Sequence, residues 1–158
     1  MFVLVRAVTY ATLFISLLLV FLPGEVLAWS GVVRPAKLGI AGIAGIALGT
    51  AGAALALWCI LTFVVVGKGT PAPFDPPRRL VVQGPYRFVR NPMYIGAGLA
   101  LLGAAIVYRS PALLGYVVVL LALTHAFVLL YEEPTLVRLF GTSYDEYRAN
   151  VRRWIPRV

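Results

Sequence analysis

The chain has 158 residues, of which 61% are hydrophobic and 13% are charged, and its formal net charge is +8. A soluble domain of this length could not bury so much apolar surface, so the composition excludes a soluble globule and predicts an all-α polytopic membrane protein. The basic residues flank apolar runs instead of lining one polar face, which argues against a nucleic-acid partner. Cys59 is the single cysteine, so no intramolecular disulfide or cysteine metal cluster can form, and we predict no metal site.

The first apolar run covers residues 7–22 and is followed by Pro23-Gly24, which predicts the end of a helix. The tripeptide Val26-Leu27-Ala28 resembles a signal-peptidase site, so a cleaved signal peptide is one interpretation. A retained helix over residues 2–22 is long enough to cross a bilayer, and we favour that interpretation.

The second apolar run covers residues 37–66. As a helix it would be longer than the roughly 30 Å of a bilayer core, so it should tilt or project from the membrane. Its first half carries five glycines along one helical stripe: Gly39, Gly42, Gly45, Gly49 and Gly52. Small residues in this pattern let a neighbouring helix approach closely. We predict a packing face, with a groove for a lipid chain as the alternative.

Residues 68–92 contain six of the eleven prolines and cannot form one regular helix. Gly84-Pro85 and Asn91-Pro92 are turn signals within this loop. Two cations and a phenol lie between these turns: Tyr86, Arg87 and Arg90. A rigid loop with such side chains suits an anionic or zwitterionic ligand. The alternative is a membrane-interface loop whose arginines meet lipid phosphates.

Two further apolar runs, residues 93–108 and 112–131, are joined at Arg109-Ser110-Pro111 and predict an antiparallel hairpin. The first run is short for a full crossing, so we expect it to start below the membrane surface. His125 lies within the second run and is an ionisable residue at membrane depth. A hydrogen-bonded packing role is the more common one for such a histidine, and a functional role is the alternative that we keep.

The distribution of cations predicts the orientation of the chain. Four spans place the amino terminus, the loop over residues 67–92 and the carboxyl-terminal tail on one side. Eleven of the fourteen lysines and arginines lie on that side, and three lie opposite: Arg34, Lys37 and Arg109. The positive-inside rule therefore predicts that the loop and the tail are cytoplasmic, facing inward from the inner membrane if the cell is bacterial.

A second group of candidate residues follows the last apolar run. Glu132 and Glu133 are adjacent at the predicted membrane boundary, where carboxylates are costly unless they are solvated, paired or bound to a cation. They could form salt bridges to Arg87 or Arg90, or they could recognise an ammonium or sulfonium group. The tail then follows the spacing of an amphipathic helix at the interface, with these residues on one face: Tyr144, Tyr147, Arg148 and Val151.

Two motifs stand in order around the hairpin. Residues 84–96 read Gly-Pro-Tyr-Arg-Phe-Val-Arg-Asn-Pro-Met-Tyr-Ile-Gly, and the second motif comprises Glu132-Glu133, Phe140-Gly141, Tyr144, Tyr147 and Val151. Together they resemble the integral-membrane methyltransferases, which include isoprenylcysteine carboxyl methyltransferases and phospholipid N-methyltransferases. The resemblance covers about residues 83–156. It implies an S-adenosylmethionine pocket that is roofed by an amphipathic tail, with a methyl acceptor that enters from the bilayer.

The resemblance also implies the residues of the site. The cofactor would contact Tyr86, Arg87, Arg90, Asn91, Pro92, Tyr94, Gly96, His125, Glu132 and Glu133. Glu133 or Tyr147 would act as a general base, and Arg153 would hold the acceptor. Two positions depart from the family pattern: Asn91 stands where histidine is common, and Val128 stands where the prenylcysteine enzymes have an arginine. We therefore expect an acceptor other than a prenylcysteine carboxylate.

We predict about four transmembrane helices in two regions. An amino-terminal two-helix region covers residues 1–66, and a methyltransferase-like core covers residues 67–158. Its partners would be a lipophilic or lipid substrate and membrane lipids. A nicotinamide-dependent membrane reductase and a non-catalytic lipid-binding subunit are the alternatives. The sequence makes no prediction of the oligomeric state.

Overall fold

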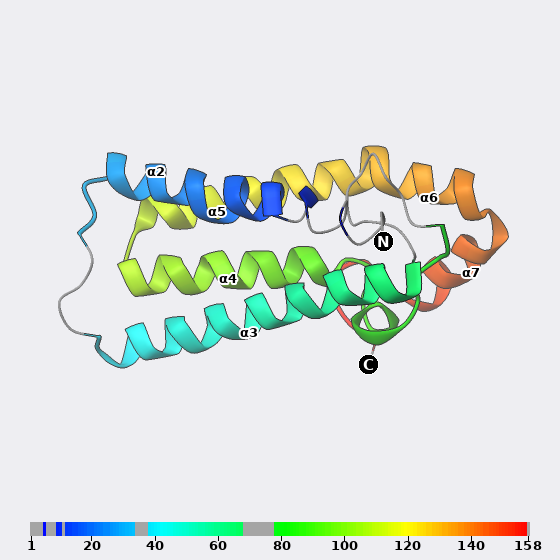
Figure 1. Ribbon diagram of the computed structural model, residues 1–158, viewed down its shortest axis with the longest axis horizontal. Coiled ribbons are helices and arrows are strands. Elements are labelled where there is room, and N and C mark those ends of the chain that lie inside the picture. The colour runs from blue at the N-terminus through cyan, green and yellow to red at the C-terminus, as the bar shows by residue number, and fades with distance from the viewer. Residues whose placement is uncertain (1–4, 6–8, 11, 34–37, 68–77, 158) are drawn as a thin grey trace.

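The computed structural model describes residues 5, 9–10, 12–33, 38–67 and 78–157. These residues form helices and connecting turns and include no strand, which confirms the all-α prediction (Figure 1). Three continuous apolar helices are long enough to cross a membrane: Thr12–Trp29, Ile40–Gly67 and Pro111–Phe140. A shorter apolar helix, α4, covers Pro92–Tyr108. The chain is thus an integral membrane protein.

The first helix continues past the predicted stop at Pro23-Gly24. Its π-helical part η1 (Ile15–Phe21) leads directly into α2 (Leu22–Trp29), so the predicted end at residue 22 is wrong. Proline lacks a backbone N–H group, and its ring needs room near the preceding turn. The wide π turn ahead of Pro23 provides that room, and the helix continues.

The last helix repeats this arrangement. It comprises α5 (Pro111–Phe127), π-helical η4 (Val128–Glu132) and α6 (Glu133–Phe140). The helix continues beyond the predicted apolar run over residues 112–131, because Pro134 again follows a π-helical segment and the chain stays helical. Glu132 and Glu133 therefore lie within one long helix. The membrane boundary at Glu132 and Glu133 stays a prediction. Gly141 (φ +50°) then turns the chain back into α7 (Thr142–Asn150).

Close backbone contact joins α3 (Ile40–Thr62), which ends in π-helical η2 (Phe63–Gly67), to α4. A Cβ atom placed on Gly103 would lie 2.5 Å from the carbonyl oxygen of Gly45 and from the nitrogen of Gly49. One placed on Gly52 would lie 2.6 Å from the carbonyl oxygen of Gly96. The predicted packing face is confirmed, and we name these contacts the glycine interface.

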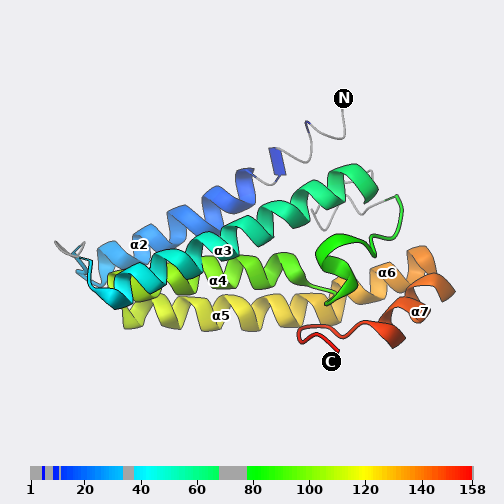
Figure 2. The ribbon, with the colours of Figure 1, turned by 90° about the horizontal axis from the view of Figure 1, so that it is seen from below.

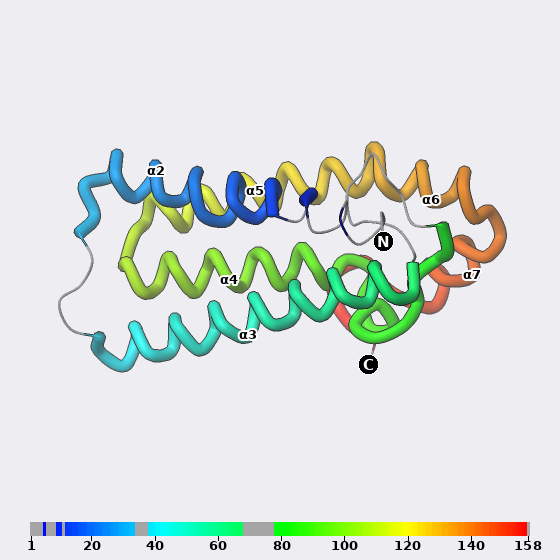
Figure 3. Tube along the Cα trace, in the orientation of Figure 1, coloured from blue at the N-terminus to red at the C-terminus, as the bar shows by residue number. Residues whose placement is uncertain are grey.

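The hairpin between α4 and α5 is also confirmed. Arg109 adopts a left-handed conformation (φ 49°) at the end of α4, and the Ser110 hydroxyl accepts a hydrogen bond from the Leu113 amide at the start of α5. Tyr116 of α5 donates to the Leu18 carbonyl oxygen at 2.8 Å and so links the first helix to this hairpin. Figures 2 and 3 show α4 running between α3 and α5, and Figure 2 shows the tail folding back toward α5.

The end of the bundle that holds α6 and α7 lies opposite Arg109 and the α4–α5 turn (Figure 1). The predicted loop over residues 68–77 and the cations Arg6, Arg34, Lys37 and Lys68 lie outside the described residues. The side of the membrane on which α6 and α7 lie stays a prediction.

Candidate active site

The two predicted turn signals build one wall of the site. Gly84 (φ +59°) starts the 3-10 helix η3 (Gly84–Arg87), which places the Tyr86 ring edge-to-face against Phe63, with ring centroids 5.2 Å apart. Pro92 forces Asn91 out of the helical region (φ −124°, ψ 51°), so α4 starts at Pro92. The side chains of this wall are therefore held by backbone geometry and by packing on η2.

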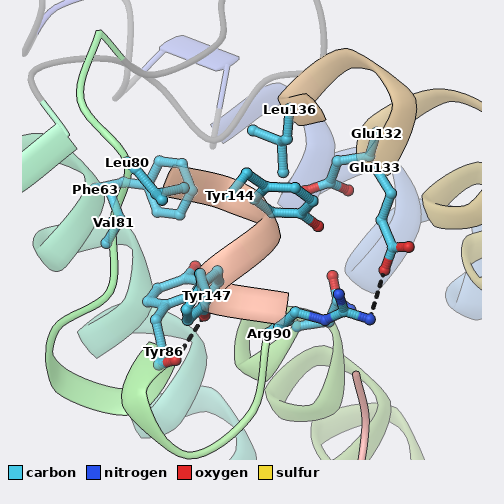
Figure 4. Close-up of a pocket in the computed structure, with 11 residues that line it drawn as sticks. Phe63, Leu80, Val81, Tyr86, Arg90, Glu132, Glu133, Leu136, Tyr144 and Tyr147 are labelled. Carbon is cyan, nitrogen blue, oxygen red and sulfur yellow. Dashed lines mark hydrogen bonds and ion pairs between the residues drawn. The ribbon is translucent and has the colours of Figure 1, made fainter. Parts of the chain in front are cut away.

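A small cavity lies between η2, η3, η4, α6 and α7 (Figure 4). Its volume is about 40 Å³. Aromatic, apolar and charged side chains line it: Phe63, Leu80, Val81, Tyr86, Arg90, Asn91, Glu132, Glu133, Leu136, Tyr144 and Tyr147. We name it the candidate cavity.

Two arginines hold Glu133. Arg153 forms a bidentate pair with its two carboxylate oxygens, at 2.7 and 2.8 Å, and an Arg90 terminal nitrogen lies 3.0 Å from Oε1. The side chains of Arg90 and Glu133 are only 10% and 13% exposed. The hydrogen bond to Glu133 raises the pKa of Arg153. The Nε of Arg90 is buried and has no hydrogen-bond partner in the described structure, so one donor of this cation remains for an acceptor.

Glu132 has a different environment, although it is the next residue. It accepts a hydrogen bond from the Tyr94 hydroxyl at 3.0 Å. Within the described part of the chain, no ion pair reaches Glu132. The two adjacent carboxylates therefore differ in their partners: one is held by two guanidinium groups and the other by a phenol.

The carboxyl-terminal strap, residues 151–157, lies against this site. The Arg90 amide donates to the Arg152 carbonyl oxygen at 2.9 Å, and the Asn91 side chain donates to the Arg153 carbonyl oxygen at 3.3 Å. Farther along, the Trp154 indole N–H donates to His125 Nδ1 at 3.0 Å. The strap thus connects the start of α4 to α5.

Tyr147 and Tyr144 of α7 close the cavity from the tail side. The Tyr147 hydroxyl donates to the Tyr86 carbonyl oxygen at 2.6 Å (Figure 4). Tyr144 is only 2% exposed, and burial raises its pKa to about 12. Burial also raises the pKa values of Tyr147 and Tyr86, so all three phenols are neutral at physiological pH.

The structure brings most of the predicted site residues together. Six line the cavity: Tyr86, Arg90, Asn91, Glu132, Glu133 and Tyr147. Three contact this shell or its strap through hydrogen bonds: Tyr94, His125 and Arg153. Pro92 is buried at the start of α4. Arg87 instead lies over the Phe88 ring, and Gly96 lies in the glycine interface.

Several lining residues were not predicted as site residues. The spacing of Tyr144 with Tyr147 indicated a membrane-facing helix, but α7 turns Tyr144 into the cavity. Phe63, Leu80, Val81 and Leu136 carry no local signal, because an apolar side chain in a membrane protein is as consistent with packing or lipid contact as with a site. Trp154 was part of the tail, and its contact with His125 depends on the fold.

The molecule is thus a helical membrane protein with an ionic cluster and a second, half-buried carboxylate where two distant segments meet. The family described as phospholipid methyltransferase matches residues 40–143, about two thirds of the chain. The chain belongs to this family, and the predicted relationship to membrane methyltransferases is confirmed. Comparisons with curated proteins and with solved structures gave no match. The match starts before residue 67, and the predicted division at that position stays a prediction.

Proposed function

We propose that this protein transfers a methyl group from S-adenosylmethionine to an amine on a lipid headgroup. One observation carries the proposal: Glu132 is a cavity-lining carboxylate with a phenol partner and, among the described residues, no cation. An amine acceptor must lose a proton when it is methylated, so it requires a base. Glu132 is free to take that proton, whereas Arg90 and Arg153 occupy Glu133.

The two bases predicted from the sequence fit this task less well. The Tyr147 hydroxyl donates to a backbone oxygen, and burial raises its pKa, so it is a poor proton acceptor near neutral pH. Charge-assisted contacts from Arg153 and Arg90 already occupy both oxygens of Glu133. Tyr94 holds the Glu132 carboxylate in one orientation through its 3.0 Å hydrogen bond. We therefore assign Glu132 as the base and Tyr94 as its positioning residue.

The remaining groups suit the cofactor. S-adenosylmethionine supplies an electrophilic methyl group when bound, and it also carries a carboxylate, an ammonium and a sulfonium. Arg90 has an unsatisfied buried Nε for the carboxylate, and Glu133 suits the ammonium. The aromatic rings of Tyr86 and Tyr144 can face a cationic sulfur. The donor set fits the cofactor without any metal.

The acceptor class follows from charge. A carboxylate acceptor needs no base, and the cavity-facing Glu132 would repel it. A protonated amine is attracted by the same carboxylate and can pass its proton to it. Val128, which stands where an arginine would support a carboxylate acceptor, is apolar and only 1% exposed. These features favour an aminophospholipid over a prenylcysteine, in agreement with the family description.

The length of α4 supports access from the bilayer. Its 17 residues span about 25 Å, which is less than the roughly 30 Å of a bilayer core. The site at the start of α4 would therefore lie below the membrane surface. A lipid headgroup could reach it while the acyl chains stay in the membrane.

The test supplies labelled S-adenosylmethionine with an aminophospholipid and, separately, with a prenylcysteine analogue. We expect methylation of the aminophospholipid. Glu132→Gln should lower kcat by about 10²–10⁴-fold, the usual contribution of a general base, while cofactor affinity changes little. Full activity in Glu132→Gln, or methylation of the prenylcysteine analogue alone, would refute the proposal.

We also infer that α6 and α7 face the cytoplasm, from the cation count. Labelling of single cysteines at Ser143 and Ser30, in a Cys59→Ala background, tests this. Both native side chains are exposed, and they lie at opposite ends of the bundle. Ser143→Cys should react only from the cytoplasmic side and Ser30→Cys only from the other side. The reverse pattern would invert the orientation.

A further inference from the structure

The carboxyl-terminal strap is held differently from the helices around it. None of its seven residues, 151–157, is buried, and Ile155 is 69% exposed. Polar contacts from three positions bind it to elements other than the adjacent α7: Arg152, Arg153 and Trp154. Two more join it to α7: the Val151 amide donates to the Tyr147 carbonyl oxygen at 2.9 Å, and the Arg157 guanidinium donates to the Ala149 carbonyl oxygen at 3.1 Å. A segment with few buried apolar contacts opens locally at a small cost in free energy.

The cavity next to the strap, whose lining residues Arg90, Asn91 and Glu133 contact it, is too small for the proposed ligand. Its volume of about 40 Å³ is well below the roughly 300–1,000 Å³ of pockets that enclose ligands of this size. Arg153 of the strap also occupies both oxygens of Glu133, the carboxylate that suits a ligand ammonium. A cationic ligand group and Arg153 therefore compete for the same carboxylate.

Apart from its contacts with the adjacent α7, the strap has one described attachment point that involves neither the cavity nor the start of α4. Trp154 donates its indole N–H to His125 Nδ1 of α5 at 3.0 Å, and the two rings lie 5.8 Å apart. The other contacts join the strap to Arg90, Asn91 and Glu133. The Trp154–His125 contact thus closes the strap onto a second element.

We propose that the strap is a gate for the cofactor, and that Trp154 is the positioning residue that latches it to His125. This inference rests on the proposed function. Opening of the strap withdraws Arg153 from Glu133. The cavity then becomes larger on the side where Glu133 lies. The ligand ammonium then takes the place of Arg153 at Glu133, while Arg90 stays on the same carboxylate. Closure of the strap onto His125 slows release of the ligand.

The first test needs no ligand. Hydrogen exchange of the Arg90 amide reports strap opening, because this amide donates to the Arg152 carbonyl oxygen. Trp154→Phe keeps an aromatic ring but removes the N–H donor, and it should accelerate this exchange by roughly threefold to tenfold, the effect of one lost hydrogen bond. Trp29→Phe is the matched control, because Trp29 is 87% exposed at the far end of the bundle. Equal exchange in the two variants would overturn the latch.

A double variant tests the contact itself. His125→Leu should accelerate Arg90 exchange as much as Trp154→Phe does. If the two side chains act through one hydrogen bond, the combined variant should exchange no faster than either single variant. Additive acceleration would show that Trp154 and His125 act separately.

The second test measures S-adenosylmethionine binding by rapid mixing. In Trp154→Phe, the association and dissociation rate constants should both rise by roughly threefold to tenfold, so that Kd changes less than either rate. Faster Arg90 exchange with unchanged binding rates would show that the strap opens but does not gate the ligand. Absence of binding in the native protein would refute the proposed function and the gate, while the exchange result would still decide whether Trp154 latches the strap.

Discussion

Two regions of α4 are held by different forces. Along its length, the glycine interface brings α4 against α3 so closely that a Cβ on Gly103 would meet backbone atoms at 2.5 Å. At its start, ion pairs and hydrogen bonds connect α4 to Glu133 and to the strap, with donor–acceptor distances of 2.7–3.3 Å. Backbone contact leaves no room for rearrangement, whereas a polar contact can be exchanged for another of similar chemistry.

This difference explains how a small membrane protein can combine a rigid frame with an exchangeable site. The glycine interface fixes the position of α4 in space relative to α3. It therefore also fixes the positions of Arg90 and Asn91, which immediately precede α4. The strap and Arg153 can then move without disturbing that frame. Three predictions test the comparison, from the largest expected effect to the smallest.

The ionic cluster should contribute most. Glu133→Gln leaves Arg90 and Arg153 without their shared carboxylate, and it should lower the free energy of unfolding by about 3–5 kcal/mol. Asp145→Asn is the matched control, because its pair with Arg148 is 48% exposed on both sides and should contribute less than about 1 kcal/mol. Chemical unfolding in the same detergent compares the two. Similar losses of unfolding free energy in the two variants would mean that burial does not strengthen the ion pairs of Glu133.

The glycine interface should come second. Gly103→Ala forces a methyl group against the backbone of α3 and should cost about 1–3 kcal/mol of unfolding free energy. Gly115→Ala on α5 meets no atom within 4 Å and should instead stabilise its helix by about 0.5–1 kcal/mol. Thermal unfolding of the two variants should shift Tm in opposite directions. A neutral Gly103→Ala would show that α3 and α4 can separate at little cost.

Alkaline pH should weaken the polar region through Tyr144. Burial raises the pKa of Tyr144 to about 12, so its phenol stays neutral in the folded protein while it ionises in the unfolded chain above pH ~10. The unfolded state then binds fewer protons, and stability falls as pH rises from about 10 to 12, by about 1 kcal/mol at pH ~11. Tyr144→Phe removes this loss and should gain in Tm relative to the native protein over that range. A difference in Tm between the two proteins that does not change with pH would contradict the assignment of this loss of stability to Tyr144.

The apolar runs and the glycine stripe predicted the helices and one packing face, because lipid solvation acts locally along the chain. The stop at Pro23 was wrong, since a π turn ahead of the proline relieves the clash that usually ends a helix, and the last helix continues through Pro134 in the same way. The sequence left open a salt bridge from the glutamate pair to Arg87 or Arg90, and the structure forms it between Arg90 and Glu133.

The partners within the site depended on the tertiary structure. Nothing in the sequence distinguishes Glu132 from Glu133, and their roles separate only when Tyr94 reaches one and Arg153 reaches the other. The contact between Trp154 and His125 joins residues 29 positions apart on separate elements. Contacts of this kind follow from how α7 folds back and leave no periodic signal.

The unequal helix lengths have a consequence for the membrane itself. Helix α4 has 17 residues, while its neighbours Ile40–Gly67 and Pro111–Phe140 have 28 and 30. Such hydrophobic mismatch is relieved when lipids beside the short helix thin and those beside the long helices thicken. The depth of the proposed site below the headgroups would then depend on acyl-chain length, and the thickness of the surrounding membrane would set how far the proposed acceptor must descend.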